Sequence, residues 1–533
     1  MKKVLLFFLA TFVSSLSIIA ATNMCVKFYD GKILRYNVDD IAEVFYEEIG
    51  SIISEDTTAI DTSATPLQFD IAFSPTFDSI ITVISYPCSD VDTTIVIPSK
   101  VRIEGKVYPV TCIRSNAFAG CSGLTSIKIP SSITSIESQA FEGCSGLTSI
   151  VIPESVTCIG GLAFAGCSGL TSIKIPSRIT SIENQVFRGC SGLTSIEIPS
   201  SVTSIESCAF GGCSGLTSIE IPSGVTSIGD HAFNGCSSLT SIEIPSGVTS
   251  IGDDAFKNCS GLTSIEIPSS VTNIGNDAFY KCSGLTSINV ALENLNYSSK
   301  AGILYDKEVK VIITVPMGKK GSIKIPSSVT NIGNSAFEGC SGLTSIEIPS
   351  SVTSIGNSAF AGCSGLTSIE IPSGVTNIEK YAFYKCSGLK SIEIPSGVTN
   401  IGNSAFVGCS SLTNIEIPSS VTSIESSAFR DCSGLTSIKI PESVTSIGSS
   451  AFSGCSGLTS IEIPLGVRGI EGGAFYNCSG LTSIKIPSSV TSIGDYAFED
   501  CNKLDIVIDN SKDNITIGNY AFKGCKSVTY LKE

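Results

Sequence analysis

Apolar residues recur along this chain in an order that repeats about every 23 residues. In the unit that spans residues 124–144, the apolar positions are Leu124, Ile127, Ile129, Ile133, Ile136, Ala140, Phe141 and Cys144. Ile127 and Ile129 flank Lys128, and this period of two predicts a strand with one buried face. Pro130 follows and ends the strand, because proline has no amide hydrogen to donate to a ladder.

The second half of each unit has a different spacing. Ile133 and Ile136 are three residues apart, which predicts an extended segment on a second wall. Residues 137–143 predict a short helical turn whose apolar side chains point inward. Gly143 and Gly166 come just before a cysteine and are typical of a left-handed exit from such a turn. The predicted caps of the turn are Asp and Asn side chains, namely Asp230, Asp253, Asn276, Asn334 and Asn357.

A unit this short cannot bury its own apolar residues, so it must stack on copies of itself. A cysteine marks the repeat every 23 residues from Cys121 to Cys282, and again from Cys340 to Cys501. The predicted fold is a single elongated, curved, β-rich solenoid with a parallel sheet on one side and short helical turns on the opposite side. About eighteen strands at a spacing of about 4.8 Å predict a sheet about 80 Å long.

The beginning of the chain predicts export. Residues 1–21 are typical of a signal peptide, because Lys2 and Lys3 precede an apolar run that is too short to favour a membrane span. We therefore expect a secreted or cell-surface protein with no membrane span after removal of the signal. Cys25 leaves a lipid anchor open, although residues 22–24 before it make a poor lipoprotein signal.

The rest of the chain divides by how well it follows the repeat. Asp30-Gly31 lies between two β-rich runs and predicts a hairpin, and the polar residues 53–66 predict a linker. The predicted divisions are a hairpin element and linker at 22–66, an N-terminal cap and first coil at 67–120, the solenoid at 121–502, and a degenerate C-terminal cap at 503–533.

One coil departs from the 23-residue repeat. From Ile288 to Ile323 it takes 35 residues instead of 23. The additional residues, 290–321, hold two β-rich runs separated by Asp306-Lys307-Glu308, which predicts a projecting hairpin. A tolerated loop and a ligand-contact element both remain open, since loops on rigid scaffolds often carry binding.

Composition argues against several classes of function. Charged residues make up 15% of the chain and the net charge is −15, so nucleic acid is not an expected partner. His231 is the single histidine, so we expect no metal site, no cofactor and no Ser-His-Asp triad. A glycosidase needs two carboxylates in differing environments, which a uniform column of repeats does not provide. We therefore expect no enzymatic activity.

Seventeen of the 22 cysteines, from Cys121 to Cys525, occupy one equivalent position of the repeat. Two interpretations are open for this column: reduced thiols buried in the core, or disulfides between some neighbouring coils. An odd-numbered column cannot pair completely, and pairing would disturb the even spacing of the coils. Metal binding is disfavoured, because the column supplies no histidine and no second ligand.

The residue between the two strand isoleucines points outward, and in two runs of coils it is glutamate. These residues are Glu197, Glu220, Glu243 and Glu266, followed by Glu347, Glu370, Glu393 and Glu416. Duplication of one repeat would copy glutamate without any ligand. The alternative hypothesis is that both columns form an acidic ligand-binding face for a basic protein segment or for divalent cations. Flanking columns of Thr and Ser, such as Thr125 and Ser126, offer hydroxyls to glycans or water.

The segment from Cys236 to Pro245, Cys-Ser-Ser-Leu-Thr-Ser-Ile-Glu-Ile-Pro, followed by residues 252–256, Gly-Asp-Asp-Ala-Phe, resembles the BspA-like leucine-rich repeat family. Its Leu-x-x-Ile-x-Ile core matches the leucine-rich repeat template, with Ser or Gly at the template's Asn/Cys position. The resemblance covers about residues 95–530. It implies a leucine-rich repeat solenoid in a bacterial secreted or surface protein, and several members of the family are adhesins for host matrix or plasma proteins or for other cells.

The predicted function is a non-catalytic scaffold that binds a protein or glycan ligand. The resemblance favours an adhesin that recognises host matrix proteins or other cell surfaces through the face of the solenoid. The alternative is a structural surface or matrix component whose main contacts are copies of itself, so self-association also stays open.

Overall fold

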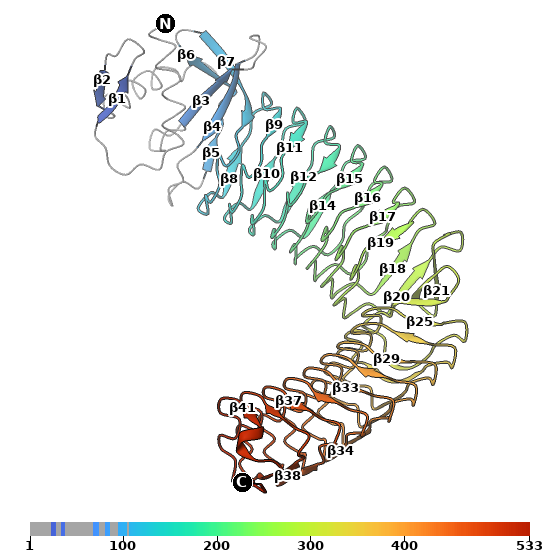
Figure 1. The fold of residues 1–533 in the computed structure, drawn as a ribbon. Helices are drawn as coiled ribbons and strands as arrows, with labels where there is room; N and C mark the ends of the chain where they lie inside the picture. The colour runs from blue at the N-terminus through green and yellow to red at the C-terminus, as the bar shows by residue number, and fades with distance from the viewer. Residues whose placement is uncertain are drawn as a thin grey trace. The chain divides into compact units, whose positions relative to one another are not determined.

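The computed structural model describes residues 94–103 and 106–532 and four earlier strands, which are β1 (Asn23–Lys27), β2 (Ile33–Asn37), β3 (Gln68–Phe73) and β4 (Ile80–Ser85). The predicted signal peptide and the predicted linker at 53–66 lie outside the described residues. The chain divides into two compact units, Met1–Pro222 and Ser223–Glu533. Each unit is a parallel-strand β-solenoid with coils of about 23 residues, which confirms the predicted fold class (Figure 1).

The first wall of unit 1 is a five-stranded sheet in the order β14-β12-β10-β8-β5, and its strands pair in parallel. The strands are β5 (Thr94–Val96), β8 (Ser126–Lys128), β10 (Ser149–Val151), β12 (Ser172–Lys174) and β14 (Ser195–Glu197). In β8, Ile127 is buried while Ser126 and Lys128 are exposed. The predicted period of two is confirmed, and each strand ends before its proline.

The second wall of unit 1 begins with the eight-residue strand β7 (Lys106–Ile113). It continues with two-residue strands, β9 (Ser135–Ile136), β11 (Cys158–Ile159), β13 (Ser181–Ile182) and β15 (Ser204–Ile205). Equivalent residues of successive coils face each other, such as Ile136 and Ile159. Before the regular coils, β3 pairs with β4 in antiparallel orientation and β4 pairs with β7 in parallel. β6 (Lys100–Ile103) pairs antiparallel with β7, and β1 pairs antiparallel with β2.

The first wall of unit 2 consists of three sheets: β18-β20, β24-β26, and eight strands from β28 to β42. The strands are β18 (Ser264–Ile267), β20 (Ser287–Val290), β24 (Gly321–Lys324), β26 (Leu343–Glu347), β28 (Ser368–Glu370), β30 (Ser391–Glu393), β32 (Asn414–Glu416), β34 (Ser437–Lys439), β36 (Ser460–Ile461), β38 (Ser483–Ile486), β40 (Asp505–Ile508) and β42 (Ser527–Tyr530). The eight-stranded sheet is parallel and in register, so the same repeat position forms a column along it.

The second wall of unit 2 repeats the pairing of the short strands. They are β16 (Ser227–Ile228), β17 (Ser250–Ile251), β19 (Asn273–Ile274), β25 (Asn331–Ile332), β27 (Ser354–Ile355), β29 (Asn377–Ile378), β31 (Asn400–Ile401), β33 (Ser423–Ile424), β35 (Ser446–Ile447), β37 (Gly469–Ile470), β39 (Ser492–Ile493) and β41 (Thr516–Ile517). Seven of them, from β29 to β41, form one sheet. The buried isoleucines of both walls face each other across the core.

Phenylalanine forms a column in the core of the regular coils, interrupted between Phe279 and Phe337. Phe360, Phe383 and Phe406 are all 0% exposed. The ring centroids of Phe383 and Phe406 are 5.3 Å apart and their planes differ by 4°. Offset stacking of this kind adds about 0.5–1.5 kcal/mol per pair to the burial of the rings. The prediction that the apolar side chains of residues 137–143 point inward is confirmed, since Phe141 is 0% exposed.

The predicted helical turns are instead successive β-turns. Hydrogen bonds in this segment join residues three apart, such as Ala140 N–H to the Glu137 carbonyl at 3.3 Å. Gln139 has a φ of 60°, and a left-handed residue at this point prevents a regular helix. Gly143 has a φ of 72°, so the predicted left-handed exit is confirmed. In the described part of the chain, the one assigned helix is the 3-10 turn η1 (Lys512–Asn514).

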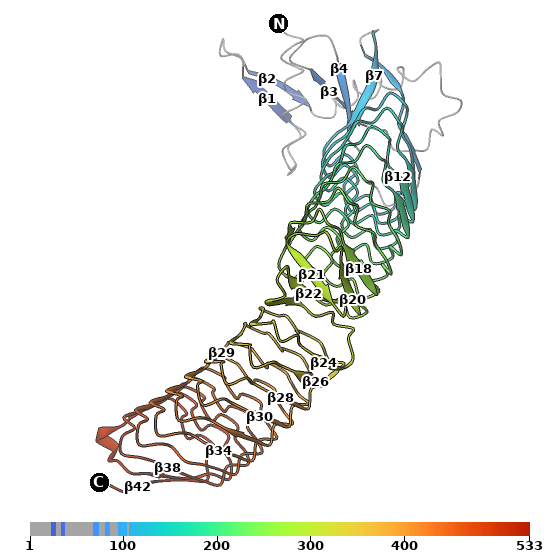
Figure 2. The same ribbon diagram turned by 90° about the vertical axis from the view of Figure 1, so that its right-hand side faces the viewer.

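The long coil adds three strands, β21 (Tyr297–Lys300), β22 (Ile303–Asp306) and β23 (Val311–Thr314). β21 and β22 pair antiparallel, as expected for a hairpin, and lie against β20 (Figure 2). β23 then pairs antiparallel with β22 and parallel with β25. Tyr305 is 1% exposed. The insertion therefore belongs to the stack and does not project as expected, because its apolar residues complete the core.

Candidate binding face on the parallel strands

The eight predicted glutamates all lie on the outer face of the first wall. Six of them stand on strands, namely Glu197, Glu266, Glu347, Glu370, Glu393 and Glu416. Glu220 and Glu243 occupy the same repeat position in coils where no strand is assigned. Every one of the eight side chains is exposed, because the flanking isoleucines turn into the core.

Register brings three of these glutamates together. Glu370 faces Glu393, and Glu393 faces Glu416, on β28, β30 and β32. Neighbouring parallel strands are about 4.8 Å apart. Two carboxylates at that distance in water repel each other by about 1 kcal/mol, and salt screens this repulsion. The column is therefore a concentrated negative strip that its own backbone holds in place.

Lysines bound the column at both ends. Glu416 faces Lys439 on β34, and Lys324 on β24 pairs with Glu347 at 2.5 Å. Both partners of that ion pair are mostly exposed, so its net contribution to stability is about 0–1 kcal/mol. Their effect is to limit the length of the negative strip.

The threonine column beside the glutamates has a structural role. Thr436 Oγ1 donates to the Thr413 carbonyl at 3.2 Å, and Thr459 Oγ1 donates to the Thr436 carbonyl at 3.2 Å. Thr148 and Thr125 make the same type of contact in unit 1 at 3.5 Å. These hydroxyls donate hydrogen bonds between successive coils. Fewer of the threonine hydroxyls expected from the sequence to bind glycans are therefore available as donors.

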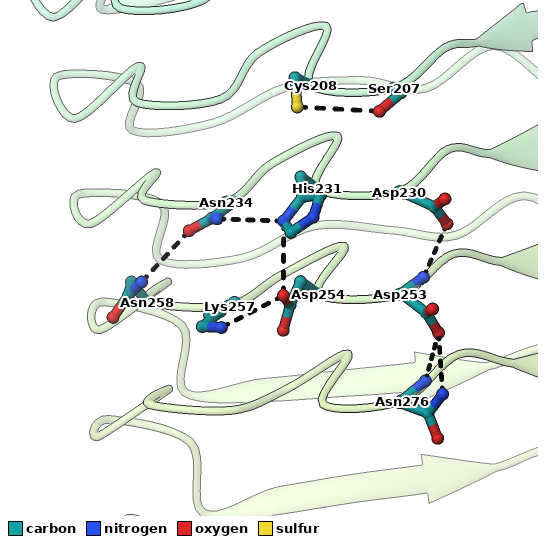
Figure 3. A network of polar contacts seen from close by, with 10 residues as sticks. All are labelled: Ser207, Cys208, Asp230, His231, Asn234, Asp253, Asp254, Lys257, Asn258 and Asn276. Atoms are coloured by element: carbon teal, nitrogen blue, oxygen red, sulfur yellow. Dashed lines mark hydrogen bonds and ion pairs between the residues drawn. The ribbon is translucent and has the colours of Figure 1, made fainter.

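The β-turns that follow the short strands of unit 2 carry a polar network around the single histidine (Figure 3). His231 Nδ1 lies 3.5 Å from Asp254 Oδ2 and 3.3 Å from Asn234 Nδ2. Lys257 Nζ also reaches Asp254 Oδ2, at 3.1 Å. The His231 side chain is 41% exposed. The network joins neighbouring coils through ordinary surface contacts.

The predicted capping residues act between coils. Asp230 Oδ1 accepts the N–H of Asp253 at 2.9 Å, and Asp253 Oδ1 accepts the N–H of Asn276 at 2.6 Å (Figure 3). Asn334 and Asn357 repeat this contact at 2.9 Å. This ladder of side-chain oxygens was not predicted from the sequence, although the spacing of 23 residues between the Asp and Asn positions was a signal for it.

A family model described as "BspA type Leucine rich repeat region (6 copies)" matches residues 111–236, 203–303, 319–436 and 423–532. The chain belongs to the BspA-type leucine-rich repeat family. Comparison with curated proteins found no match.

Solved structures of leucine-rich repeat proteins resemble this chain. A leucine-rich cell surface protein of Faecalibacterium prausnitzii A2-165 is 32% identical, with a TM-score of 0.54, over 76% of this chain and 95% of that one. A leucine-rich repeat protein of Eubacterium ventriosum is 30% identical, with a TM-score of 0.49, over 62% of this chain and 83% of that one.

The cysteines of these BspA-type repeats are mainly structural. From Cys144 to Cys525 the column consists of free thiols. Cys409 Sγ donates to the Phe383 carbonyl at 3.2 Å. Burial raises the pKa of Cys386 to about 12, so the reactive thiolate is suppressed at neutral pH. Cys121, the first of the column, is disulfide-bonded, but its partner lies outside the column, because every other column member is a free thiol. The interpretation as reduced core thiols therefore holds from Cys144 onward, and no disulfide joins neighbouring members of the column.

Two absences hold for the described part of the chain. Its His, Cys, Asp and Glu side chains form no group of three or more that could hold a metal ion. No helix there has the length and apolar character that crossing a membrane requires. The divalent-cation alternative for the glutamate columns therefore has no clustered ligand set among these residues.

The structure also groups lysines that the sequence analysis did not connect. Lys300, Lys319, Lys320 and Lys324 surround a cleft of about 590 Å³ in unit 2. The available signal was local charge, because residues 291–324 hold six lysines and three acidic residues, 6 − 3 = +3, in a chain of net charge −15. Spacing alone does not place the four lysines together, because two inserted strands separate Lys300 from Lys319.

Proposed function

We propose that this protein is a secreted or surface-held adhesin, a non-catalytic scaffold that recognises host matrix proteins or other cell surfaces through the outer face of its parallel strands. The observation that carries the proposal is the registered column Glu370-Glu393-Glu416 on a rigid parallel sheet. A broad strip of fixed charge suits a protein surface better than a small molecule, because it offers many weak contacts over a long face.

Family membership supports this proposal. The chain belongs to a family of repeat proteins, and one similar solved structure is that of a cell surface protein. Export by residues 1–21 is part of the proposal, as is recognition of a ligand with a basic surface. Charge complementarity would speed the encounter and make it sensitive to ionic strength.

The test is binding of the purified chain to an array of host matrix proteins and glycans. We expect binding to at least one protein with a basic patch, and about tenfold weaker binding as salt rises from about 0.05 M to about 0.5 M. Changing Glu370, Glu393 and Glu416 to Gln should weaken binding by at least tenfold.

A matched control changes three exposed glutamates outside the two columns to Gln, namely Glu154, Glu442 and Glu471. These changes remove the same net charge, so we expect binding within twofold of the unchanged protein. Equal losses in both variants would mean that net charge rather than the column is recognised. Absence of binding to every protein on the array, or binding insensitive to salt, would contradict the proposal.

A further inference from the structure

The cleft among the four lysines lies where the first wall of unit 2 is interrupted. Four segments line it: the residue before β20, Thr286; the β21–β22 hairpin with Lys300; the loop with Lys319 and Lys320; and β24 with the proline that follows it. Its volume of about 590 Å³ lies within the range of about 300–1,000 Å³ that is typical of ligand pockets. The described residues thus provide a concave site that the regular coils lack.

The charges that line the cleft are mostly uncompensated. Lys324 pairs with Glu347, but Lys319 Nζ donates only to the neutral Ala301 carbonyl, at 2.6 Å. Within the described residues, Lys300, Lys319 and Lys320 form no ion pair. Burial lowers the pKa of Lys319, which reflects the cost of holding its ammonium group away from water without an anion. An anionic ligand would remove that cost.

One edge of β24 is free of strand partners. β24 pairs with β26 alone. The N–H groups of Gly321 and Ile325 point toward β26 and donate to the Gly342 and Glu347 carbonyls. Successive residues of a strand direct their backbone groups to opposite sides. The N–H and C=O groups of Ser322 and Lys324 therefore point away from β26, and both of these residues line the cleft.

Apolar residues also line the cleft. Ile303 is 3% exposed, Tyr305 is 1% exposed and Ile323 is 8% exposed, and all three contribute to the walls. No hydrogen bond of the Tyr305 hydroxyl is present among the described residues. Burial raises the pKa of Tyr305 to about 12, so the hydroxyl stays protonated and remains a donor. A ligand here would meet apolar surface between cations.

We propose that this cleft binds an extended acidic peptide segment of a partner protein, which pairs as a strand with the free edge of β24 and places carboxylates beside Lys300, Lys319 and Lys320. An extended chain repeats its backbone donors and acceptors every second residue, as the Ser322 and Lys324 groups do. Lysine binds carboxylates as a point charge, so the cleft selects charge while the edge selects an extended backbone. Lys324 connects this cleft to Glu347 of the second glutamate column. The proposed peptide contacts use the edge of β24 with Lys300, Lys319 and Lys320, so the proposal does not depend on the function proposed above.

The test uses the full chain and a fluorescein-labelled hexapeptide of alternating valine and glutamate, followed by fluorescence anisotropy. We expect saturable binding that weakens with salt and is at least tenfold weaker for the same peptide with glutamine in place of glutamate. The double variant Lys319→Gln, Lys320→Gln should weaken binding at least tenfold. A control double variant, Lys310→Gln, Lys439→Gln, removes two exposed lysines outside the cleft and should stay within twofold.

A second arm tests the strand pairing. The same peptide methylated on alternate backbone nitrogens should bind at least tenfold more weakly, because it loses the donors that face β24. Equal binding of the methylated peptide would overturn the pairing. A sulfated polysaccharide that binds in place of the peptide, and loses affinity in the Lys319→Gln, Lys320→Gln variant, would overturn the peptide assignment. Absence of peptide binding to a folded chain would overturn the proposal as a whole.

Discussion

The regular coils from β28 to β42 and the insertion at 290–321 contribute to the same kind of buried core by different pairing of their strands. In the regular coils, every position has the same neighbours one coil away, so one successful residue is copied as a column of Glu, Thr, Cys or Phe. In the insertion, β21 and β22 pair antiparallel, and Tyr305 fills core space without a column. Repetition thus produces an extended and uniform surface, whereas its interruption produces a concave site with mixed chemistry.

Alkaline pH should separate the two regions most strongly. Burial raises the pKa of Cys386 and of Cys455 to about 12, from an ordinary value of 9.0. Between about pH 9 and pH 12 these thiols ionise in the unfolded chain but not in the folded one. The free energy of unfolding should therefore fall by about 1.4 kcal/mol per pH unit for each such thiol. Stability is retained below pH 9 and lost as pH rises through this window.

Hydrogen exchange measured by mass spectrometry at increasing pH, corrected for the intrinsic exchange rate, would follow each region. Peptides from the β28–β42 coils should lose protection first, because those coils carry a column of such thiols. The insertion has no cysteine, and its Tyr305, with a pKa of about 12, begins to contribute only above about pH 10. Simultaneous loss in both regions, or a triple variant Cys363→Ala, Cys386→Ala, Cys409→Ala with unchanged pH dependence, would refute this account.

Loss of one stacked ring is the next largest effect. Phe383→Ala removes a fully buried side chain from between Phe360 and Phe406, and should cost about 3–5 kcal/mol in local unfolding free energy. Limited proteolysis of this variant should cut first near the coil that contains residue 383, since the stability of each coil depends mainly on its neighbours. The control Tyr381→Ala changes an exposed aromatic residue in the same coil and should cost less than 1 kcal/mol. Similar effects of both changes would show that the column is not the main support.

Neutralising the middle of the glutamate column should have the smallest effect, and in the opposite direction. Glu393→Gln removes repulsion from Glu370 and Glu416, so it should stabilise the folded chain by about 0.5–1 kcal/mol at low salt and by less at high salt. Glu347→Gln, which loses the ion pair with Lys324, should be neutral or slightly destabilising. Thermal unfolding at two salt concentrations would compare them, and destabilisation by Glu393→Gln would contradict the repulsion.

Local patterns were sufficient to predict the regular coils. The alternation at Ile127 and Ile129, the strand end before Pro130 and the left-handed Gly143 all follow from the chemistry of a few adjacent residues. Each of these features depends on the residue and its immediate neighbours. For the same reason the outward direction of the glutamates was predictable, whereas their binding role remains a prediction.

Features that depend on neighbouring coils were harder to predict. The Gln139 position adopts a left-handed conformation, where Leu162 and Gln185 in the next coils do the same, and this replaces the expected helical turn. Asp230 bonds to the next coil, and that contact requires the register between coils. The lysines of the cleft come together only because β23 joins the second wall, which no short-range pattern specifies.

The contact between each thiol and the phenylalanine carbonyl of an adjacent coil bears on how this protein can change in length. Cys432 Sγ donates to Phe406, Cys455 Sγ to Phe429 and Cys478 Sγ to Phe452, each at 3.1 Å. Each coil therefore supplies a thiol donor to one neighbouring coil and a carbonyl acceptor to the other. Recombination between repeated DNA that adds or removes a whole coil leaves every thiol donor with a carbonyl acceptor. Variants with more or fewer coils should therefore fold as this one does.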